Sequence, residues 1–318
     1  MTESEPSTGP LLGGGVEFDT IRRLLARWGN RAIGVGDDAA VVQLPRGDAL
    51  VASSDAFVEG HHFRSPWLSA REIGYKAVTA ALSDLAAMAA QPLGILVNIS
   101  VPERWLPSLD GIADGIGDAL DAAGTSILGG NLTAAGELNL TTTVLGSAFS
   151  PLRRTGLRPG DGLYVTGRLG GPGAAVAAWE RGEVPAAEHR RRFVHPSARL
   201  HEARWLLDRG ATAAIDISDG LAADLEHLVL ASGVGADVDL ASLPLVAGLN
   251  DVTRAAASGE EYELLVGAPT ALDAAEFEQT FEIPLTAIGR ATPRGTGVSF
   301  RRGAERVAKP SGYDHLSR

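Results

Sequence analysis

The 318-residue chain is predicted to fold as an α+β (mixed α/β) protein of two domains. Its length is that of roughly two average domains. Apolar strand-like runs alternate with amphipathic helical patterns in both halves, and a loop rich in Pro, Gly and Arg, PLRRTGLRPGD, follows residue 150. We therefore expect a flexible tail at 1–15, an N-terminal sheet-and-helix domain at 16–149, and a C-terminal α/β domain at 150–318.

Hydrophobic periodicity assigns the elements in chain order. In the first half, helical patterns cover about 17–28, 69–90 and 104–123, and strand-like runs cover 50–55, 93–101 and 138–148. After the loop, strands are expected near 162–166, 212–217, 235–240, 261–267 and 285–291. Helices alternate with these strands near 171–181, 196–209, 219–232 and 269–280.

Composition excludes several classes of protein. Hydrophobic residues make up 45% and charged residues 21%, as in a folded globular chain. The absence of cysteine excludes disulfides, cysteine-ligated zinc, iron–sulfur clusters and a thiol nucleophile. No apolar run reaches the roughly 18 residues of a membrane helix, and the polar, glycine-rich N-terminus does not read as a secretion signal. We expect a cytoplasmic protein.

The formal net charge of −11 disfavours nucleic acid and anionic membranes as partners. A phosphate-bearing ligand is compatible with this charge if metal ions supply the missing positive charge. The placement of individual carboxylates therefore bears on function.

Carboxylates occur at a turn and at a strand end in the first half. Asp37 and Asp38 follow a glycine turn, where neighbouring carboxylates repel each other unless a cation or hydrogen-bond donors are present. Asp55 ends the run LVASSD, and with Ser53 and Ser54 it forms an oxygen-rich strand end suited to Mg²⁺. A solvated turn and a strand that ends in polar residues are the alternative interpretations.

The helix expected at 69–90 has an unusual second face. One face is an apolar stripe of Tyr75, Val78, Leu82, Leu85 and Met88. The opposite face holds Ala77, Ala80, Asp84 and Ala87. A solvated face usually carries Lys, Glu or Arg, whereas small residues permit close approach by a backbone or a ligand. We therefore expect Asp84 to point into a site, the alternative being an ordinary exposed aspartate.

Another carboxylate interrupts the apolar segment AAIDISDG (213–220). Asp216 falls in a run that reads as buried, where an unpaired carboxylate costs several kcal/mol. A metal ion or an arginine would relieve that cost. Ser218 or Asp219 is expected to cap the following helix.

Other motifs are weaker. LGGN (128–131), just before a strand, and GRLGGPG (167–173), between a strand and a helix, offer backbone N–H groups to phosphate. Neither is a GxGxxG fingerprint, and no GxxxxGK[ST] or GxSxG motif is present. The two histidines of VEGHHF (58–63) lack a metal-binding spacing and read as surface residues.

Taken together, these segments resemble the thiamine-monophosphate kinase family, in the superfamily of aminoimidazole ribonucleotide synthetase. They occur in the family's order over about residues 34–315. The matching segments are GVGDDAAVV (34–42), SSDAFVEGHHF (53–63), YKAVTAALSDLAAMAAQP (75–92), ILGGN (127–131), RTGLRPGDGLYVTGRLG (154–170), AIDISDGLAADLEHL (214–228) and SGEEYELL (258–265).

The resemblance implies phosphorylation of thiamine phosphate to thiamine diphosphate with ATP and Mg²⁺. It also implies a homodimer formed through the N-terminal sheet, with ATP bound between the domains. The implied metal positions are Asp38, Ser53, Ser54, Asp55, Asp84, Asp216 and Asp219, of which Asp55, Asp84 and Asp216 also carry the catalytic role. The implied nucleotide positions are Gly130, Asn131, Arg154 and Ser218, and the thiamine-phosphate positions are His62 and Glu260.

The chain departs from the family pattern at three places. Asn131 stands where the family usually has Asp, so it can offer Mg²⁺ a carbonyl oxygen but no charge. Ser258 replaces a glycine in a segment that keeps both following acids. Pro310 takes the place of a tryptophan, which removes an aromatic wall unless Tyr313 or another ring replaces it.

Two other functions stay open on the residues alone. The missing cysteines argue against the selenophosphate synthetase and hydrogenase-maturation branches of the superfamily. An aminoimidazole ribonucleotide synthetase-like enzyme is the enzymatic alternative. A nucleotide-binding dimer with weakened catalysis is the non-enzymatic one, motivated by Asn131 and Pro310.

Overall fold

A computed structural model describes residues 15–33, 35 and 39–312. Asp37, Asp38, Tyr313 and all but the last residue of the tail expected at 1–15 lie outside the described residues. Predictions that fall on them are therefore not addressed by the structure.

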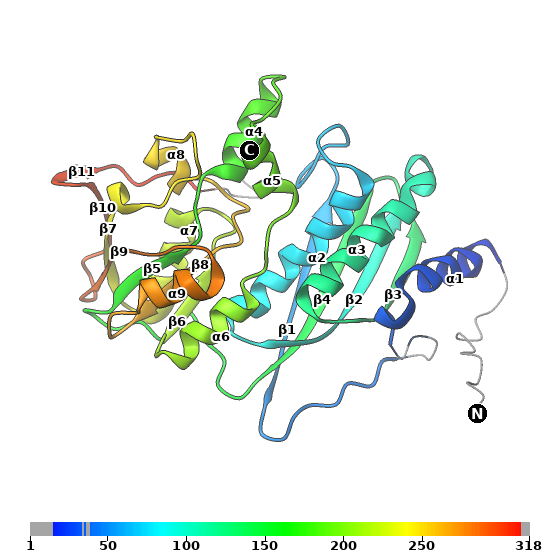
Figure 1. Cartoon of the computed structure of the whole chain (residues 1–318), viewed down its shortest axis with the longest axis horizontal. Coiled ribbons are helices and arrows are strands. Elements are labelled where there is room, and N and C mark those ends of the chain that lie inside the picture. Colours follow the sequence, from blue (N-terminus) through cyan, green and yellow to red (C-terminus); the bar gives the residue numbers. More distant parts are fainter. Residues whose placement is uncertain (1–14, 34, 36–38, 313–318) are drawn as a thin grey trace. The chain divides into compact units, whose positions relative to one another are not determined.

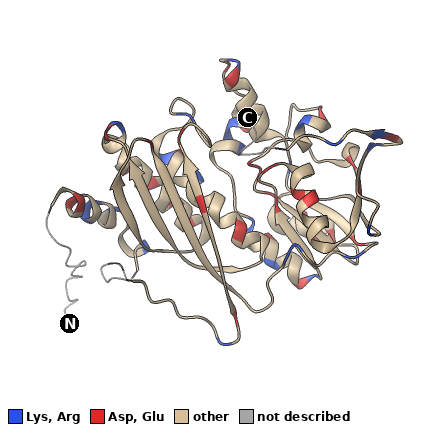
Figure 2. Cartoon of the chain, turned by 180° about the vertical axis from the view of Figure 1, so that it is seen from behind, with Lys and Arg blue, Asp and Glu red and all other residues tan. Residues whose placement is uncertain are grey.

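The first sheet has four strands in the order β1-β4-β2-β3, and β2 and β3 run parallel. Its strands are β1 (Ala49–Val58), β2 (Gln91–Val101), β3 (Ile127–Ala134) and β4 (Asn139–Ala148). The helices that accompany it are α1 (Val16–Trp28), α2 (Ala70–Ala87) and α3 (Leu109–Ala123). Figure 1 shows α2 and α3 on one side of this sheet, and Figure 2 shows its other side with no helix across the strands.

Helices α2 and α3 approach each other closely through glycines. A Cβ on Gly115 of α3 would lie 1.8 Å from the Arg71 carbonyl oxygen, and one on Gly74 would lie 2.1 Å from the Ile112 carbonyl oxygen. The backbones therefore touch where a side chain would normally separate them. Helix α1 packs on α3, where the Trp28 indole N–H donates to the Ala113 carbonyl (3.0 Å).

The second sheet has seven strands in the order β11-β10-β7-β9-β5-β8-β6. They are β5 (Gly162–Thr166), β6 (Ala213–Asp216), β7 (Gly235–Asp239), β8 (Leu264–Ala268), β9 (Leu285–Thr292), β10 (Val298–Arg302) and β11 (Glu305–Val307). The helices are α4 (Gly171–Glu180), α5 (Ala187–Val194), α6 (Leu200–Asp208), α7 (Leu221–Ser232), α8 (Val252–Ala256) and α9 (Ala274–Phe281). Among the described residues, no helix is both long and apolar enough to cross a membrane.

The core of the second part lies between its sheet and α7. Leu221, Leu225 and Leu228 of α7 are fully buried against residues of β5, β6 and β7. On β5 and β6 this core receives Leu163, Val165 and Ile215. Burial on one face of a strand fixes its register, so the residue that ends β6 is held in place by its apolar neighbours.

The mixed α/β class is correct, and several elements differ from their expected extents. The segment LGGN (128–131), expected to lie just before a strand, lies itself within strand β3. The strand expected at 261–267 begins only at Leu264, and the helix expected at 269–280 begins at Ala274, capped by the Asp273 carboxylate. The short elements α5, α8, β10 and β11 carry weak periodicity and were not expected.

Contacts divide the described chain into two compact units. The first contains residues up to Pro45, Ser54–Val78 and Pro92–Leu145. The second contains Arg46–Ser53, Thr79–Gln91 and the chain from Gly146 onward. The second unit thus includes the end of α2 and the start of β1. The domain boundary at 149/150 stays a prediction.

Candidate functional site

Asp216 is the last residue of β6, and its side chain is buried. Only 4% of the residue is exposed, and its Oδ2 accepts a hydrogen bond from the Ser83 hydroxyl of α2 (2.8 Å). The sequence prediction that this carboxylate is buried is therefore confirmed.

Asp84 follows Ser83 on α2 and is half-buried. Its carboxylate accepts a hydrogen bond from the Ser53 hydroxyl of β1, and it forms no ion pair with the described residues. The alanines of the same helix face are buried: Ala77 is 1% and Ala80 8% exposed. Asp84 is therefore not an ordinary solvated aspartate.

The turn between β6 and α7 is held by a carboxylate that the sequence did not single out. Gly220 precedes α7 and no side chain caps it, so the expected cap at Ser218 or Asp219 is wrong. Instead, the Asp224 Oδ2 accepts the backbone N–H groups of Ser218 and Asp219, each at 3.1 Å. An acid inside the helix thus reaches back to the turn.

Burial, together with the charges of Asp216 and Asp219, raises the pKa of Asp224 to about 8. The charges of Asp216 and Asp219 thus disfavour the ionised form of Asp224, and a bound cation would relieve that effect. The described residues contain no group of three His, Cys, Asp or Glu already arranged to hold a metal ion. Carboxylate oxygens are suitable ligands for a hard cation. The described carboxylates do not by themselves form a complete coordination shell.

Strand β1 separates the polar residues of SSD by its alternation. The Ser53 hydroxyl donates to Asp84, whereas the Ser54 hydroxyl bonds that of Thr143 on β4 (2.9 Å). Successive side chains of a strand point to opposite faces, so Ser53 and Asp55 share one face and Ser54 lies on the other. Asp38, the remaining residue of the implied metal set, lies outside the described residues.

Gly130 and Asn131 lie inside β3. A Cβ on Gly130 would sit 1.8 Å from the Val97 carbonyl oxygen of β2, so the close approach of two strands already requires glycine there. Asn131 is exposed and pairs in register with Asn98. Strand packing alone therefore explains the glycine. The contact of Gly130 with a nucleotide stays a prediction.

His62 and Arg154 have defined surroundings. The His62 Nδ1 accepts the backbone N–H of Val58 (3.1 Å), which in the neutral ring leaves the proton on Nε2 as a donor. The side chain of Arg154 is exposed and pairs with none of the described acids. The His62 Nε2–H and the Arg154 guanidinium are hydrogen-bond donors, and phosphate oxygens accept hydrogen bonds.

The segment Ser258–Leu264 lies against the end of β6 in an unusual backbone conformation. The N–H of Glu260 donates to the Ser218 carbonyl (2.7 Å), and the N–H of Tyr262 donates to the Ile217 carbonyl (2.9 Å). Glu260 and Tyr262 have φ of 58° and 52°, in the left-handed region. Non-glycine residues there are strained, and such strain gathers at functional sites.

Two buried acids of this segment were not distinguished by the sequence. Glu261 accepts the Gly170 N–H at the start of α4 (2.6 Å), and burial raises its pKa to about 8. Glu263 is fully buried with Arg199. No sequence pattern marks them, because residues 261–264 are all buried, and the arginine partner of Glu263 is 64 residues away in the chain.

The glycine-rich turn 167–173 is not an open phosphate cradle. The N–H groups of Gly167 and Leu169 donate to Pro284 and Pro244 carbonyls, and Gly173 donates to the Ser258 hydroxyl (2.9 Å). With the bond from Gly170 to Glu261, four of its donors are already used within the protein. The sequence-based suggestion for this turn is therefore wrong in this structure.

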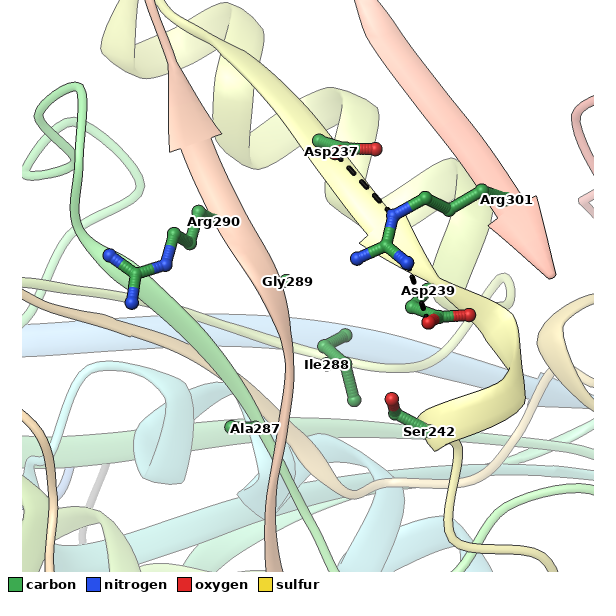
Figure 3. A pocket seen from close by; sticks show the side chains of 8 residues that line it. All are labelled: Asp237, Asp239, Ser242, Ala287, Ile288, Gly289, Arg290 and Arg301. Carbon is green, nitrogen blue, oxygen red and sulfur yellow. Dashed lines mark hydrogen bonds and ion pairs between the residues drawn. The ribbon is translucent and has the colours of Figure 1, made fainter. Parts of the chain in front are cut away.

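A separate polar pocket of about 250 Å³ lies on the outer strands of the second sheet. Arg301 crosses it and pairs with Asp239 (2.7 Å) and Asp237 (3.6 Å), and Figure 3 shows the guanidinium groups of Arg301 and Arg290 on opposite sides of Gly289. None of the residues predicted for the site lines this pocket. Its charges are largely paired with each other.

Comparisons with known proteins show which protein families the chain is similar to. Residues 36–148 match the family model of the AIR synthase related protein N-terminal domain, and residues 158–301 match that of the C-terminal domain. The thiamine-monophosphate kinase of Escherichia coli K12 is 36% identical over 309 residues, which cover 90% of this chain and 92% of that protein.

Solved structures extend the comparison to the fold. The thiamine-monophosphate kinase of Stenotrophomonas maltophilia K279a has a TM-score of 0.81 at 32% identity, covering 92% of this chain and 98% of that one. A structure described as AaThiL complexed with AMPPCP and TMP has a TM-score of 0.75 at 27% identity, covering 94% and 96%.

Proposed function

This chain belongs to the thiamine-monophosphate kinase family of AIR synthase related proteins, and we propose from this membership that it transfers the γ-phosphoryl group of ATP to thiamine phosphate. The product is thiamine diphosphate. The solved relative described with AMPPCP, an ATP analogue, and TMP supports both substrates.

The chemistry requires positioning and charge neutralisation more than a nucleophile–base pair. The acceptor is a phosphate monoester that is already anionic near neutral pH, so no group has to deprotonate it. Two polyanions must instead approach in line. The observation that carries the proposal at the site concerns Asp84, which is half-buried, accepts a hydrogen bond from the neutral Ser53 hydroxyl and forms no ion pair with the described residues. The buried Asp216 accepts a hydrogen bond from Ser83 on the same helix.

Mg²⁺ is the cation that these residues would hold. Hard carboxylate oxygens suit it, and the unfavourable effect of the Asp216 and Asp219 charges on ionised Asp224 supports a positive charge near the β6–α7 turn. When bound, the ion would neutralise phosphate oxygens. Asp38, Ser53, Asp55, Asp84, Asp216 and Asp219 are the proposed ligands. Ser54, which was expected among them, directs its hydroxyl to Thr143 on the opposite face of β1 and is not proposed as a side-chain ligand.

The remaining site residues act on the substrates. Ser218, Gly130, Asn131 and the exposed Arg154 are proposed to contact ATP, and a forked guanidinium is suited to phosphate oxygens. His62, through Nε2, and Glu260 are proposed to contact thiamine phosphate. The protein is further proposed to be a cytoplasmic homodimer joined through the open face of its first sheet, in support of which that face carries no helix in Figure 2.

A direct assay tests the proposed reaction. The purified chain is incubated with ATP, Mg²⁺ and thiamine phosphate, and the products are separated by chromatography. Thiamine diphosphate should form with Mg²⁺ and not with excess EDTA. Hydrolysis of ATP without thiamine diphosphate would contradict the proposal and would favour the nucleotide-binding alternative.

A further inference from the structure

Glu263 is a buried charge that the proposed reaction does not use. Its carboxylate accepts two hydrogen bonds from Arg199, at 2.7 and 2.6 Å, one from Arg192 (3.0 Å) and one from the Thr166 hydroxyl (2.8 Å). Its side chain is only 1% exposed. Buried ion pairs contribute little net stability compared with apolar residues of the same volume, so their presence calls for another explanation.

The backbone of Glu263 belongs to the strained segment. Its carbonyl accepts the N–H of Ile217 (2.8 Å), while Tyr262 and Glu260 donate back to Ile217 and Ser218. Three hydrogen bonds thus join residues 260–263 to the strand end that carries the proposed nucleotide residue. Left-handed φ values at two non-glycine residues are strained and persist only where the surroundings enforce them.

The Glu263 side chain also fixes the turn after β5. A Cβ on Gly167, where φ is +62°, would lie 2.0 Å from the Glu263 Oε1, so the carboxylate occupies the space of a side chain. Arg192, which pairs with Glu263, also donates to the Arg168 carbonyl (2.7 Å). One carboxylate therefore ties the turn at 167–168, helix α5 and the 260–263 segment together.

We infer that Glu263 is a positioning residue, whose buried pairing with Arg199 and Arg192 holds the strained 260–263 backbone and, through it, Ser218 and Glu260. The effect on turnover rests on the proposed function. The effect on the backbone does not, because it follows from the hydrogen bonds alone. Glu263 touches neither substrate, and acts only through the residues that it orients.

Glu263→Gln and Glu202→Gln form a matched pair of variants. Glu202 on α6 also accepts a hydrogen bond from Arg199 (3.1 Å) and is also largely buried, but its hydrogen bonds do not reach the 260–263 segment. Each substitution removes one negative charge from the same guanidinium. A loss of stability that occurs in both variants can therefore be distinguished from a loss of positioning that occurs only in Glu263→Gln.

Amide hydrogen exchange at 25 °C on folded protein is the first measurement. Glu263→Gln should speed exchange of the Glu260 and Tyr262 amides by about tenfold or more, while Glu202→Gln leaves them close to wild type. In the kinase assay, Glu263→Gln should lower kcat by about 10²-fold with a smaller change in the KM for ATP. Equal exchange in the two variants would overturn the inference.

A second pair of variants tests the inference if Glu263→Gln does not fold. Arg192→Lys keeps the charge but replaces the two guanidinium nitrogens that donate to Glu263 and to the Arg168 carbonyl by a single ammonium nitrogen. Arg191→Lys changes the neighbouring exposed ion pair to Glu188. Faster exchange at Tyr262 in Arg192→Lys alone supports the inference, and unchanged exchange overturns it. If the wild-type chain forms no thiamine diphosphate, the proposed function fails while the exchange data still decide the positioning role.

Discussion

Asp84 is half-buried, and within the described part of the chain its carboxylate accepts a hydrogen bond from the neutral Ser53 hydroxyl, so its charge is available to a cation. Asp84→Asn keeps the shape and removes that charge. We expect kcat at saturating Mg²⁺ to fall by about 10²–10³, the usual effect of losing one electrostatic contact to the transition state. The Tm without metal should change little, because the amide oxygen can still accept the hydrogen bond from Ser53 and no ion pair with the described residues is lost.

Asp110→Asn is the control for Asp84→Asn. Asp110 begins α3 and pairs with exposed Arg23 (3.0 Å) and Arg27 (3.4 Å). Exposed pairs of this kind contribute about 0.2–1 kcal/mol, so kcat should not change and the stability change should stay within that range. If Asp84→Asn keeps wild-type kcat, or loses activity only by unfolding, Asp84 is not a metal ligand.

Glu261 should make stability depend on pH. The folded protein holds its proton up to pH of about 8, because burial raises the pKa of the carboxyl, whereas the unfolded chain releases the proton near pH 4.5. Its contribution to the free energy of unfolding is therefore complete below pH 4.5 and is lost as the pH rises through about 8. Glu261→Gln cannot ionise and should escape this loss.

Thermal unfolding at several pH values checks the effect of Glu261. Between pH 6 and pH 9, the Tm of Glu261→Gln relative to wild type should rise by at least about 2 °C. Glu278→Gln, at an exposed position of α9, should show no such trend. A constant difference between Glu261→Gln and wild type would mean that Glu261 is ionised throughout.

Single residues of the site could be predicted from the sequence where a charged side chain stood among apolar or small neighbours. Asp216 interrupts an apolar strand and Asp84 stands on an alanine face, and both anomalies are visible without a structure. Asp224 and Glu263 were not predictable in the same way. Asp224 sits at an ordinary helix position, and the meaning of Glu263 depends on Arg199 and Arg192, which only folding brings to it.

At the scale of elements, the contact between α2 and α3 depends on Gly115. Gly115→Ala places a methyl group 1.8 Å from the Arg71 carbonyl oxygen, so the helices must separate. Overpacking of this kind costs about 1–3 kcal/mol. Differential scanning calorimetry should therefore find a lower Tm for this variant.

Gly117→Ala, two residues further along the same helix, is the control. The nearest atom to its new methyl group would be the flexible Arg31 side chain at 3.8 Å, so nothing has to move. Replacing glycine by alanine inside a helix favours the helix by about 1 kcal/mol. The Tm should rise slightly, and a fall equal to that of Gly115→Ala would contradict the close approach.

Elements with long, regular patterns were predictable, and short or irregular ones were not. Helices α1, α2, α3 and α7 lie close to their expected ranges because each has a continuous apolar face. Strand β3 was missed because Gly129 and Gly130 weaken a strand pattern, although close packing on β2 is what requires the second glycine. The strand expected from 261 starts late because Glu260 and Tyr262 have left-handed φ.

At the scale of the whole molecule, the open face of the first sheet is the proposed dimer interface. Thr143 lies on that face beside Ser54, so Thr143→Arg would place a charge within the interface. Light scattering at micromolar concentration should give about twice 33.0 kDa for wild type and 33.0 kDa for the variant. Val184→Arg, at a 92% exposed position of the second unit, should stay dimeric. A monomeric wild type would contradict the interface.

The interleaving of the two units along the chain limits how the protein can be divided. The second unit includes Ser53, Ser83 and Asp84 from the first half of the sequence, and its Asp216 is bonded to one of them. A fragment beginning at residue 150 would lack the Ser83 hydroxyl that bonds this buried carboxylate, and losing a hydrogen-bond partner of a buried charge is costly. We expect such a fragment to be unfolded by circular dichroism when expressed alone.

If so, the two halves of the sequence are not modules that recombination could exchange independently between relatives. A substitution at the contact of α2 with β6 would then require a matching substitution in the other element.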